Sequence, residues 1–279
     1  MDRKKDIIIP GSGYDIHGWI RWPEGDYLNK CQEGYRAIRK LPMAIFMHGA
    51  CMGKNTMPLR ALADSLLKNG IAVLSFDFFG HGETGGDLKD MTVQEWVRNA
   101  EAVLDYAGRL SFVSDLILAG HSQGGLVASL LAGKHPDRIK VMALYAPAAV
   151  IEEIGKSGVM PKGTFDPDHI PEELPFFGSI IKGDFYRQAR ELHTYETAKN
   201  YQGPVCILQG TEDELVPVSC AKKYYEIYQD AELHLLKGED HLFKKSRYEA
   251  AGIVTAYMMG KLGGDSSEKG RVPSPDNKI

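Results

Sequence analysis

The sequence has few cysteines, little net charge and no long apolar run, and each absence excludes a class of protein. A formal net charge of -4 over 279 residues gives no electrostatic reason to expect nucleic acid or an anionic membrane as a partner. No apolar run approaches the length that spans a bilayer, and the first residues lack the apolar region of a secretory signal. The cysteines are scattered, without C-x-x-C pairs or metal-ligand spacing, at Cys31, Cys51, Cys206 and Cys220. We therefore expect reduced thiols, no metal, no cofactor and a cytoplasmic location.

What the sequence does contain is an alternation of apolar stretches of strand length with helical patterns. Continuous apolar runs predict strands over residues 6–10, 16–22, 43–48, 71–77, 115–120, 140–147, 204–210 and 232–236. Apolar residues at helical spacing predict helices over residues 56–69, 92–110, 123–134, 218–229 and 246–262. A Gly-Ser-Gly-Tyr turn joins the first two strands, which we expect to pair antiparallel at one sheet edge. The alternation is typical of an α/β fold with a mostly parallel sheet and helices on both faces.

Three stretches interrupt this alternation. Residues 23–40 are polar and predict irregular structure. Residues 148–203 are rich in proline, glycine and charge and lie between two predicted strands, which favours an inserted lid over the C-terminal edge of the sheet, where open α/β sheets bind ligands. Residues 263–279 have the composition of a disordered tail. The expected organisation is a core of residues 1–147 and 204–262 that carries the lid.

The clearest chemical motif is Gly120-His121-Ser122-Gln123-Gly124, which matches G-x-S-x-G between a predicted buried strand and a predicted helix. A sharp strand-to-helix turn strains the backbone of the serine, and glycine on both flanks avoids collisions. A chain with 30 glycines can produce this pattern by chance, so the motif needs partners. Ser122 is the candidate nucleophile.

A serine hydroxyl at neutral pH needs a base to accept its proton and an acid to orient that base. Asp213 follows the predicted strand 204–210, and His241 follows the predicted strand 232–236. Both residues should therefore lie at the sheet edge that carries Ser122. Alone, an aspartate in such a loop can serve only as a turn residue, and Glu212 and Glu214 compete for the acid role. The order Ser, acid, His in strand-following loops is typical of a catalytic triad.

The negative charge that develops on a substrate oxygen during acyl transfer needs backbone N–H donors. One donor is the amide of Gln123, the residue after the nucleophile. The other is expected from the loop after strand 43–48, where His48-Gly49 would let the chain pass close to Ser122 and leave the Ala50 amide as donor. We therefore expect the oxyanion hole at Ala50 and Gln123.

Several stretches together resemble the α/β-hydrolases and, more narrowly, the bacterial cinnamoyl (feruloyl) esterases. The shared stretches run from about residue 40 to 262 and read MHGACMGKN, FDFFGHGETGGDLKDMTVQEW, GHSQGG, DPDHIPEELPF, GTEDELVP and GEDH. The resemblance implies an α/β-hydrolase fold with an inserted lid and the roles given above for Ser122, Asp213 and His241. It also implies hydrolysis of hydroxycinnamoyl-type esters through an acyl-enzyme. The chain departs from the family at Ala50, where an aromatic residue is common.

The predicted lid is rich in aromatic and polar side chains that could line an acyl pocket or pack within the lid itself. The candidate substrate-binding residues are Phe176, Phe177, Asp184, Phe185, Tyr186 and Tyr195. The expected partner is a small-molecule ester, with no nucleic acid and no membrane. A homo-oligomer is compatible with the sequence, although no feature demands one.

Two other functions use the same residues. A thioesterase, a monoacylglycerol-type lipase or a small peptidase would share the triad, and the core sequence does not separate them from an esterase. A non-catalytic ligand-binding protein of the same fold would be expected to have lost a triad residue, and none is lost here. Metal-dependent hydrolysis would need a His/Asp/Glu cluster with ligand spacing, which the sequence lacks.

Overall fold

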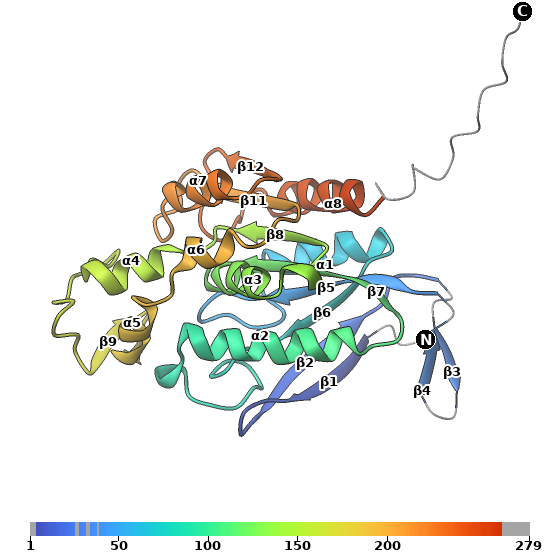
Figure 1. The fold of residues 1–279 in the computed structure, drawn as a ribbon, viewed down its shortest axis with the longest axis horizontal. Coiled ribbons are helices and arrows are strands. Elements are labelled where there is room, and N and C mark those ends of the chain that lie inside the picture. The colour runs from blue at the N-terminus through green and yellow to red at the C-terminus, as the bar shows by residue number, and fades with distance from the viewer. Residues whose placement is uncertain (1–3, 26–27, 32–33, 38, 264–279) are drawn as a thin grey trace, which may run out of the picture.

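An eight-stranded sheet forms the centre of the computed structural model, which describes residues 4–25, 28–31, 34–37 and 39–263 (Figure 1). Across the sheet the strands lie in the order β1-β2-β6-β5-β7-β8-β11-β12. Their bounds are Lys4–Pro10 (β1), Asp15–Arg21 (β2), Leu41–Met47 (β5), Ala72–Phe76 (β6), Val113–His121 (β7), Val141–Tyr145 (β8), Val205–Gly210 (β11) and Ala231–Leu236 (β12). From β6 to β12 every neighbouring pair is parallel, whereas β2 pairs antiparallel with both β1 and β6. The mostly parallel sheet and its antiparallel edge confirm the predicted architecture.

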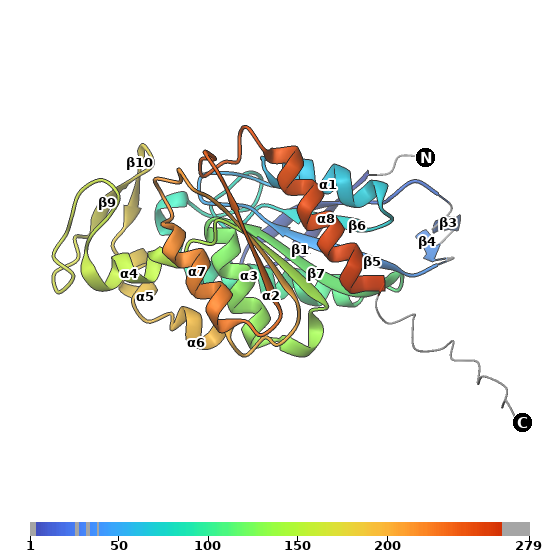
Figure 2. The same ribbon diagram turned by 90° about the horizontal axis from the view of Figure 1, so that it is seen from above.

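Helices cover both faces of this sheet, as Figure 2 shows. The long helices are α1 (Leu59–Lys68), α2 (Val93–Gly108), α3 (Gln123–Lys134), α7 (Val218–Ile227) and α8 (Arg247–Gly263). α1 and α8 lie side by side and pack on one face, while α2, α3 and α7 pack on the other. The central strands β5, β6 and β8 are therefore buried on both sides, which explains their continuous apolar sequences.

Local sequence signals determine where several of these helices begin and end. α2 begins after Thr92, whose side-chain oxygen accepts a hydrogen bond from the amide of Glu95 at 3.1 Å. α1 ends just before Gly70, which has a positive φ of 82° that favours glycine. α3 has the bounds expected from the sequence, because the turn at Ser122 fixes its start.

The chain between β8 and β11 forms short elements that extend from one end of the molecule, at the left of Figures 1 and 2. These elements are α4 (Val150–Ser157), β9 (Glu173–Phe176), β10 (Ser179–Lys182), α5 (Asp184–Ala189) and α6 (Thr194–Ala198). β9 and β10 pair antiparallel, α5 packs on α2 and α4, and α6 packs on α3. We call this part the 148–203 segment. Its role as a lid stays a prediction.

The expectation of irregular structure over residues 23–40 is wrong in part. β3 (Leu28–Cys31) and β4 (Gly34–Ala37) pair antiparallel as a separate two-stranded sheet. The hydrogen bonds of such a ladder are made by the main chain and do not require alternating apolar side chains. The sequence of these strands therefore carries no strand pattern. The two short 3-10 helices η1 (Leu88–Asp90) and η2 (Pro136–Arg138) complete the described elements.

The remaining expectations concern the tail, the membrane and the thiols. Gly263 is the last residue of α8, and the rest of the predicted tail lies outside the described residues. None of the helices in the described ranges is long and apolar enough to cross a membrane. Cys51, Cys206 and Cys220 are free thiols.

Candidate active site

Ser122 lies in a tight turn between the end of β7 and the first residue of α3. Its backbone has φ 57° and ψ -124°, a conformation that L-residues rarely adopt. The two flanking glycines make the turn sterically possible. A Cβ atom on Gly120 would lie 2.3 Å from the carbonyl oxygen of Gly124, and a Cβ atom on Gly124 would lie 2.2 Å from that of Met47. The strained serine and the crowded glycines are the features expected of a nucleophile presented on a turn.

Three side chains from three different loops form a continuous hydrogen-bonded chain at this turn. His241, in the loop after β12, places Nε2 2.9 Å from the hydroxyl oxygen of Ser122. Its Nδ1 lies 2.8 Å from Oδ2 of Asp213, in the loop after β11. A carboxylate only accepts, so the proton on Nδ1 leaves Nε2 free to accept the proton of Ser122. The structure therefore brings together Ser122, Asp213 and His241 in the geometry that general-base activation of a serine requires.

The surroundings of Asp213 keep its carboxylate charged. Burial alone would raise the pKa of this fully buried group, but hydrogen bonds from His241 and from backbone amides outweigh it, and the pKa lies below its usual range. The amides of Leu215 and Val216 donate to Oδ1 at 2.9 Å each, and the side-chain amide of Gln209 donates to Oδ2 at 2.8 Å. Neither Glu212 nor Glu214 contacts His241 through a described hydrogen bond, so Asp213 is the acid in this arrangement.

The amides of Ala50 and Gln123 are the two candidate oxyanion donors. Gln123 is the first residue of α3, where backbone N–H groups have no acceptor within the helix. Ala50 follows Gly49, where an added Cβ would lie 3.0 Å from the Cβ of Ser122, so the loop after β5 passes directly against the turn. Neither amide has a hydrogen-bond acceptor in the described part of the chain. Both donors are therefore available to a substrate oxygen.

A buried ion pair anchors the loop that carries Ala50. The ammonium of Lys54 contacts the carboxylate of Asp77, at the end of β6, and their side chains are only 9% and 2% exposed. Asp77 also accepts hydrogen bonds from the backbone amides of Lys54 at 2.8 Å and Glu83 at 3.0 Å. These contacts tie the loop after β5, which carries Ala50, to the loop after β6.

Two buried imidazoles beside the site are held neutral. His121 donates from Nε2 to the carbonyl oxygen of His241 at 2.8 Å, and its Nδ1 has no partner among the described residues. Burial and the neighbouring His241 lower the pKa of His121 to about 3. Burial likewise lowers the pKa of His48 to about 4. Both side chains thus resist protonation in the folded state.

These two histidines predict that the free energy of unfolding falls as pH is lowered. Below about pH 6.5 the unfolded chain binds protons that the folded chain excludes, so stability is full above that pH and is lost toward pH 3 to 4. Between pH 7 and 5 we expect a loss on the order of 1–2 kcal/mol for each imidazole. Urea denaturation at the two pH values measures this loss. The variant His121→Gln should show a smaller loss, whatever its stability at pH 7, and an unchanged loss would contradict the assignment.

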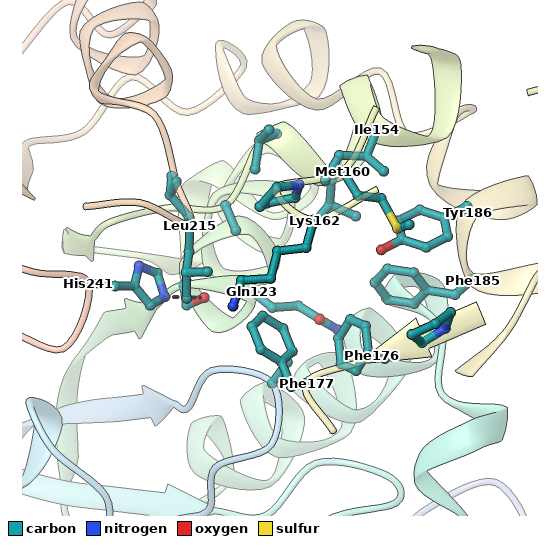
Figure 3. Close-up of a pocket in the computed structure, with 18 of the residues that line it drawn as sticks. Gln123, Ile154, Met160, Lys162, Phe176, Phe177, Phe185, Tyr186, Leu215 and His241 are labelled. Atoms are coloured by element: carbon teal, nitrogen blue, oxygen red, sulfur yellow. Dashed lines mark hydrogen bonds between the residues drawn. The ribbon is translucent and has the colours of Figure 1, made fainter. Parts of the chain in front are cut away.

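A cavity of about 530 Å³ opens beside Ser122 and His241 (Figure 3). Its walls are mostly apolar and come from the 148–203 segment and the loops after β5, β7 and β11. Four of the six candidate residues line it, namely Phe176, Phe177, Phe185 and Tyr186, and Figure 3 shows their rings gathered on one side of the cavity. Phe177 is 62% exposed, whereas the other three are buried, so Phe177 stands at the solvent side. The cavity is of the size and character of a small-molecule site.

Two predicted substrate-binding residues lie outside this cavity. Asp184 points away to solvent and pairs with Arg187 at 2.9 Å. Tyr195 packs on Tyr224 with a ring-centroid distance of 4.9 Å and lies under the cation of Lys223. The structure therefore does not bring Asp184 and Tyr195 together with the other candidate residues at the cavity, and their role as substrate contacts stays a prediction.

Other lining residues escaped sequence reading. The cavity is also lined by Val150, Ile151, Ile154, Met160, Pro161, Lys162, Leu215 and Val216. The amphipathic pattern of residues 150–157 could have indicated that α4 presents an apolar face. The Met160–Lys162 stretch carried no comparable signal. No group of three His, Cys, Asp or Glu side chains within the described ranges is arranged to hold a metal ion.

Comparisons with known proteins agree with this geometry. Residues 42–162 match the family described as serine aminopeptidase, S33. The structure of Est1E from Butyrivibrio proteoclasticus with bound ferulic acid is 30% identical, with a TM-score of 0.85, and the match covers 92% of this chain and 99% of that one. The bovine mitochondrial palmitoyl-protein thioesterase ABHD10 is 25% identical over 76% of this chain and 71% of its own length.

A monoglyceride lipase homolog of monkeypox virus is 24% identical, and the match covers 72% of this chain and 85% of the viral protein. These relatives differ in the substrates that their names give, but each is similar over most of its length. The likeness to Est1E extends over nearly both chains at 30% identity, and the TM-score of 0.85 shows that the two chains share one fold. The chain is therefore a serine hydrolase of the α/β-hydrolase superfamily, with a resemblance to the cinnamoyl esterases.

Proposed function

We propose that this protein is a carboxylesterase that cleaves small aromatic esters of the hydroxycinnamoyl type through an acyl-enzyme. The observation that carries the proposal is the cavity beside Ser122, one side of which is formed by four aromatic side chains of the 148–203 segment. Aromatic walls suit a planar conjugated acid, because ring–ring contacts add to simple apolar burial. The likeness to Est1E, whose structure holds ferulic acid, supports the same substrate class.

In the proposed reaction Ser122 attacks the ester carbonyl while Nε2 of His241 accepts the hydroxyl proton. Asp213 keeps His241 in the required tautomer and stabilises the imidazolium that forms. The carbonyl oxygen, now negatively charged, accepts hydrogen bonds from the amides of Ala50 and Gln123. His241 then returns the proton to the leaving alcohol, and the acyl group remains on Ser122.

Hydrolysis of the acyl-enzyme repeats these steps with water. His241 accepts a proton from the water molecule, the resulting oxygen attacks the acyl carbonyl, and the proton passes to Ser122 as the acid leaves. We propose that the 148–203 segment acts as a lid that shapes the acyl pocket during both halves of the reaction. Its helices α5 and α6 attach it to the core through contacts with α2 and α3.

A second candidate is hydrolysis of longer aliphatic esters or thioesters. It is favoured by the aliphatic part of the cavity wall, from Ile151, Ile154 and Met160, and by the thioesterase and lipase names among the relatives. The deciding measurement is kcat/KM for methyl ferulate beside p-nitrophenyl acetate, butyrate and octanoate and an octanoyl thioester. Ferulate turnover comparable to the short activated esters supports the proposal. Turnover that rises steadily with aliphatic chain length, with ferulate inert, would contradict it.

Neighbouring residues of α5 provide a matched pair of variants for the aromatic pocket. Phe185 is buried and lines the cavity, whereas Asp184 lies outside it. We expect Phe185→Leu to lower kcat/KM for methyl ferulate by about 5- to 10-fold relative to p-nitrophenyl acetate, because an aromatic contact is lost. Asp184→Asn should leave that ratio unchanged. If both variants change the ratio equally, the effect of substitutions in α5 comes from a loss of stability and not from a change in the pocket wall.

A further inference from the structure

Glu239 is a buried acidic side chain in the loop that carries His241, and the proposed reaction does not use it. The residue is 2% exposed and lies outside the cavity wall. Its described hydrogen bonds come from neutral donors, namely the backbone amides of Lys245 and Ser246 and the hydroxyl of Ser246. Burial of a carboxyl group costs free energy unless its oxygens are hydrogen-bonded, so these contacts fix where the side chain lies.

The side chain of Glu239 closes the loop around His241 on itself. Its Oε2 accepts hydrogen bonds from the amide and the hydroxyl of Ser246, each at 2.7 Å. The amide of Lys245 lies 3.1 Å from Oε2 and 3.2 Å from Oε1. Ser246 directly precedes α8, whose first backbone N–H groups have no acceptor within the helix. The carboxyl group therefore joins the start of the loop to the start of α8, and His241 lies between these two ends.

The main chain of Glu239 joins the same loop to the loop of Asp213. The amide of Glu212, the residue before Asp213, donates to the backbone carbonyl oxygen of Glu239 at 2.9 Å. The two loops lie close together here, because a Cβ atom on Gly210 would be 2.4 Å from that carbonyl oxygen. Glu239 is thus bound to the loop of the acid by its main chain and to the far end of the loop of His241 by its side chain.

Between these two ends the backbone of the loop is strained. Phe243 is fully buried and has φ 53°, a left-handed conformation that a bulky residue rarely adopts. Such a conformation persists only where the surrounding contacts hold it. The contacts of Lys245 and Ser246 with Glu239 hold the loop just after Phe243, and His241 lies just before it. Without those contacts the strain can relax, and the relaxation displaces His241.

We propose that Glu239 is a positioning residue that holds the imidazole of His241 between Ser122 and Asp213. This inference rests on the proposed function in taking His241 as the base. Glu239 acts through the loop, because its own contacts are with Lys245 and Ser246 and not with the reacting atoms. Its loss should lower kcat and leave KM nearly unchanged, since the cavity walls that bind the acyl group come from other loops and from the 148–203 segment.

The test compares the wild type with Glu239→Leu and Glu239→Gln. Leucine has similar size and no acceptor, whereas glutamine keeps one oxygen that can accept from Ser246. The readouts are kcat and KM for p-nitrophenyl acetate, the rate of labelling by a fluorophosphonate probe, and the low-field proton NMR resonance of Nδ1–H of His241. That proton lies in the hydrogen bond to Asp213, so its resonance reports the position of the imidazole without any substrate.

Removal of the acceptor should uncouple the base from its partners. In Glu239→Leu we expect kcat and the labelling rate to fall by about 30- to 100-fold, because a displacement of about 1 Å at a reacting group has an effect of this size. KM should stay within about threefold, and the resonance should shift or be lost through exchange with water. Glu239→Gln should restore kcat to within about fivefold of the wild type.

Two further variants separate positioning from stability. Thr92→Ala removes a comparable contact at the start of α2, where the Thr92 oxygen accepts from the amide of Glu95 at 3.1 Å. It should lower the melting temperature but leave kcat and the resonance unchanged. Should Glu239→Leu fail to fold, Ser246→Ala takes its place. It removes one hydrogen bond to Glu239 and should lower kcat by about threefold with the same shift of the resonance.

The inference is overturned if a folded Glu239→Leu variant keeps the kcat and the resonance of the wild type. It is also overturned if Thr92→Ala loses kcat to the same extent, which would identify stability as the cause, or if glutamine is as impaired as leucine. A wild type that neither cleaves p-nitrophenyl acetate nor reacts with the fluorophosphonate contradicts the proposed function instead. In that case the resonance still decides whether Glu239 holds His241 against Asp213.

Discussion

Replacement of Ser122 by alanine is expected to lower kcat for p-nitrophenyl butyrate by at least about 10³-fold and to abolish labelling by a fluorophosphonate probe. The hydroxyl of Ser122 is the group that bonds to His241 and that the crowded turn directs at the cavity, and alanine leaves nothing to form the acyl-enzyme. The fold should persist, because the change removes one oxygen atom at an element boundary. Circular dichroism and the melting temperature measure that persistence.

A serine in α3, the helix that follows Ser122, gives the control for this variant. Ser129 is fully buried in α3, where its hydroxyl donates to the carbonyl oxygen of Leu126 and contacts the hydroxyl of Tyr224, each at 2.8 Å. Ser129→Ala should cost about 1 kcal/mol of stability and keep both turnover and labelling. Near wild-type activity of Ser122→Ala, or loss of labelling only in Ser129→Ala, would place the nucleophile elsewhere.

Substitution of Gly124 by alanine is expected to have a large effect on stability. Gly124 lies in the first turn of α3, and its added Cβ would be 2.2 Å from the carbonyl oxygen of Met47 and 2.4 Å from that of His48. Both contacts are with backbone of β5 and its following loop, which cannot rotate aside as a side chain could. Relief requires α3 to move away from the sheet, and with it the turn that holds Ser122. We expect a loss of more than about 3 kcal/mol, or failure to accumulate folded protein.

The matched control is Gly252→Ala in α8, where an added Cβ meets nothing within 4 Å. There the same substitution should stabilise the protein by about 0.5–1 kcal/mol, because alanine favours a helix over glycine. Thermal and urea unfolding of the two variants measure the difference. If the two variants unfold at similar midpoints, β5 and α3 can separate without a loss of stability. That result would contradict the close packing around Gly124.

Much of the site could be predicted because its signals are local. The glycines around Ser122 follow from the steric demands of one turn, and Asp213 and His241 follow from the ends of apolar strands. The C-terminal ends of parallel strands lie at one edge of the sheet. Residues that directly follow different strands in the sequence therefore lie close together in space.

The substrate pocket was harder to predict because its geometry depends on tertiary packing. α5 has only six residues, and neighbouring side chains on a helix differ by about 100° in direction, so the sequence does not fix which of them face the cavity. Phe185 and Tyr186 face it, while Asp184 does not. Lys162 lies on the cavity wall, in a stretch whose sequence has no helical or strand pattern that would predict its position.

The separate origins of the catalytic groups and the pocket walls make the enzyme modular. Ser122, Asp213 and His241 come from loops of the sheet, whereas the aromatic walls come from the continuous 148–203 segment. Changes in the sequence of that one segment can alter which acyl group fits the pocket, while the catalytic residues remain in place. Gln123 is the exception, since it is the first residue of α3 after the serine turn and also lines the pocket. A change in the 148–203 segment therefore leaves the part of the pocket wall next to the nucleophile as it is.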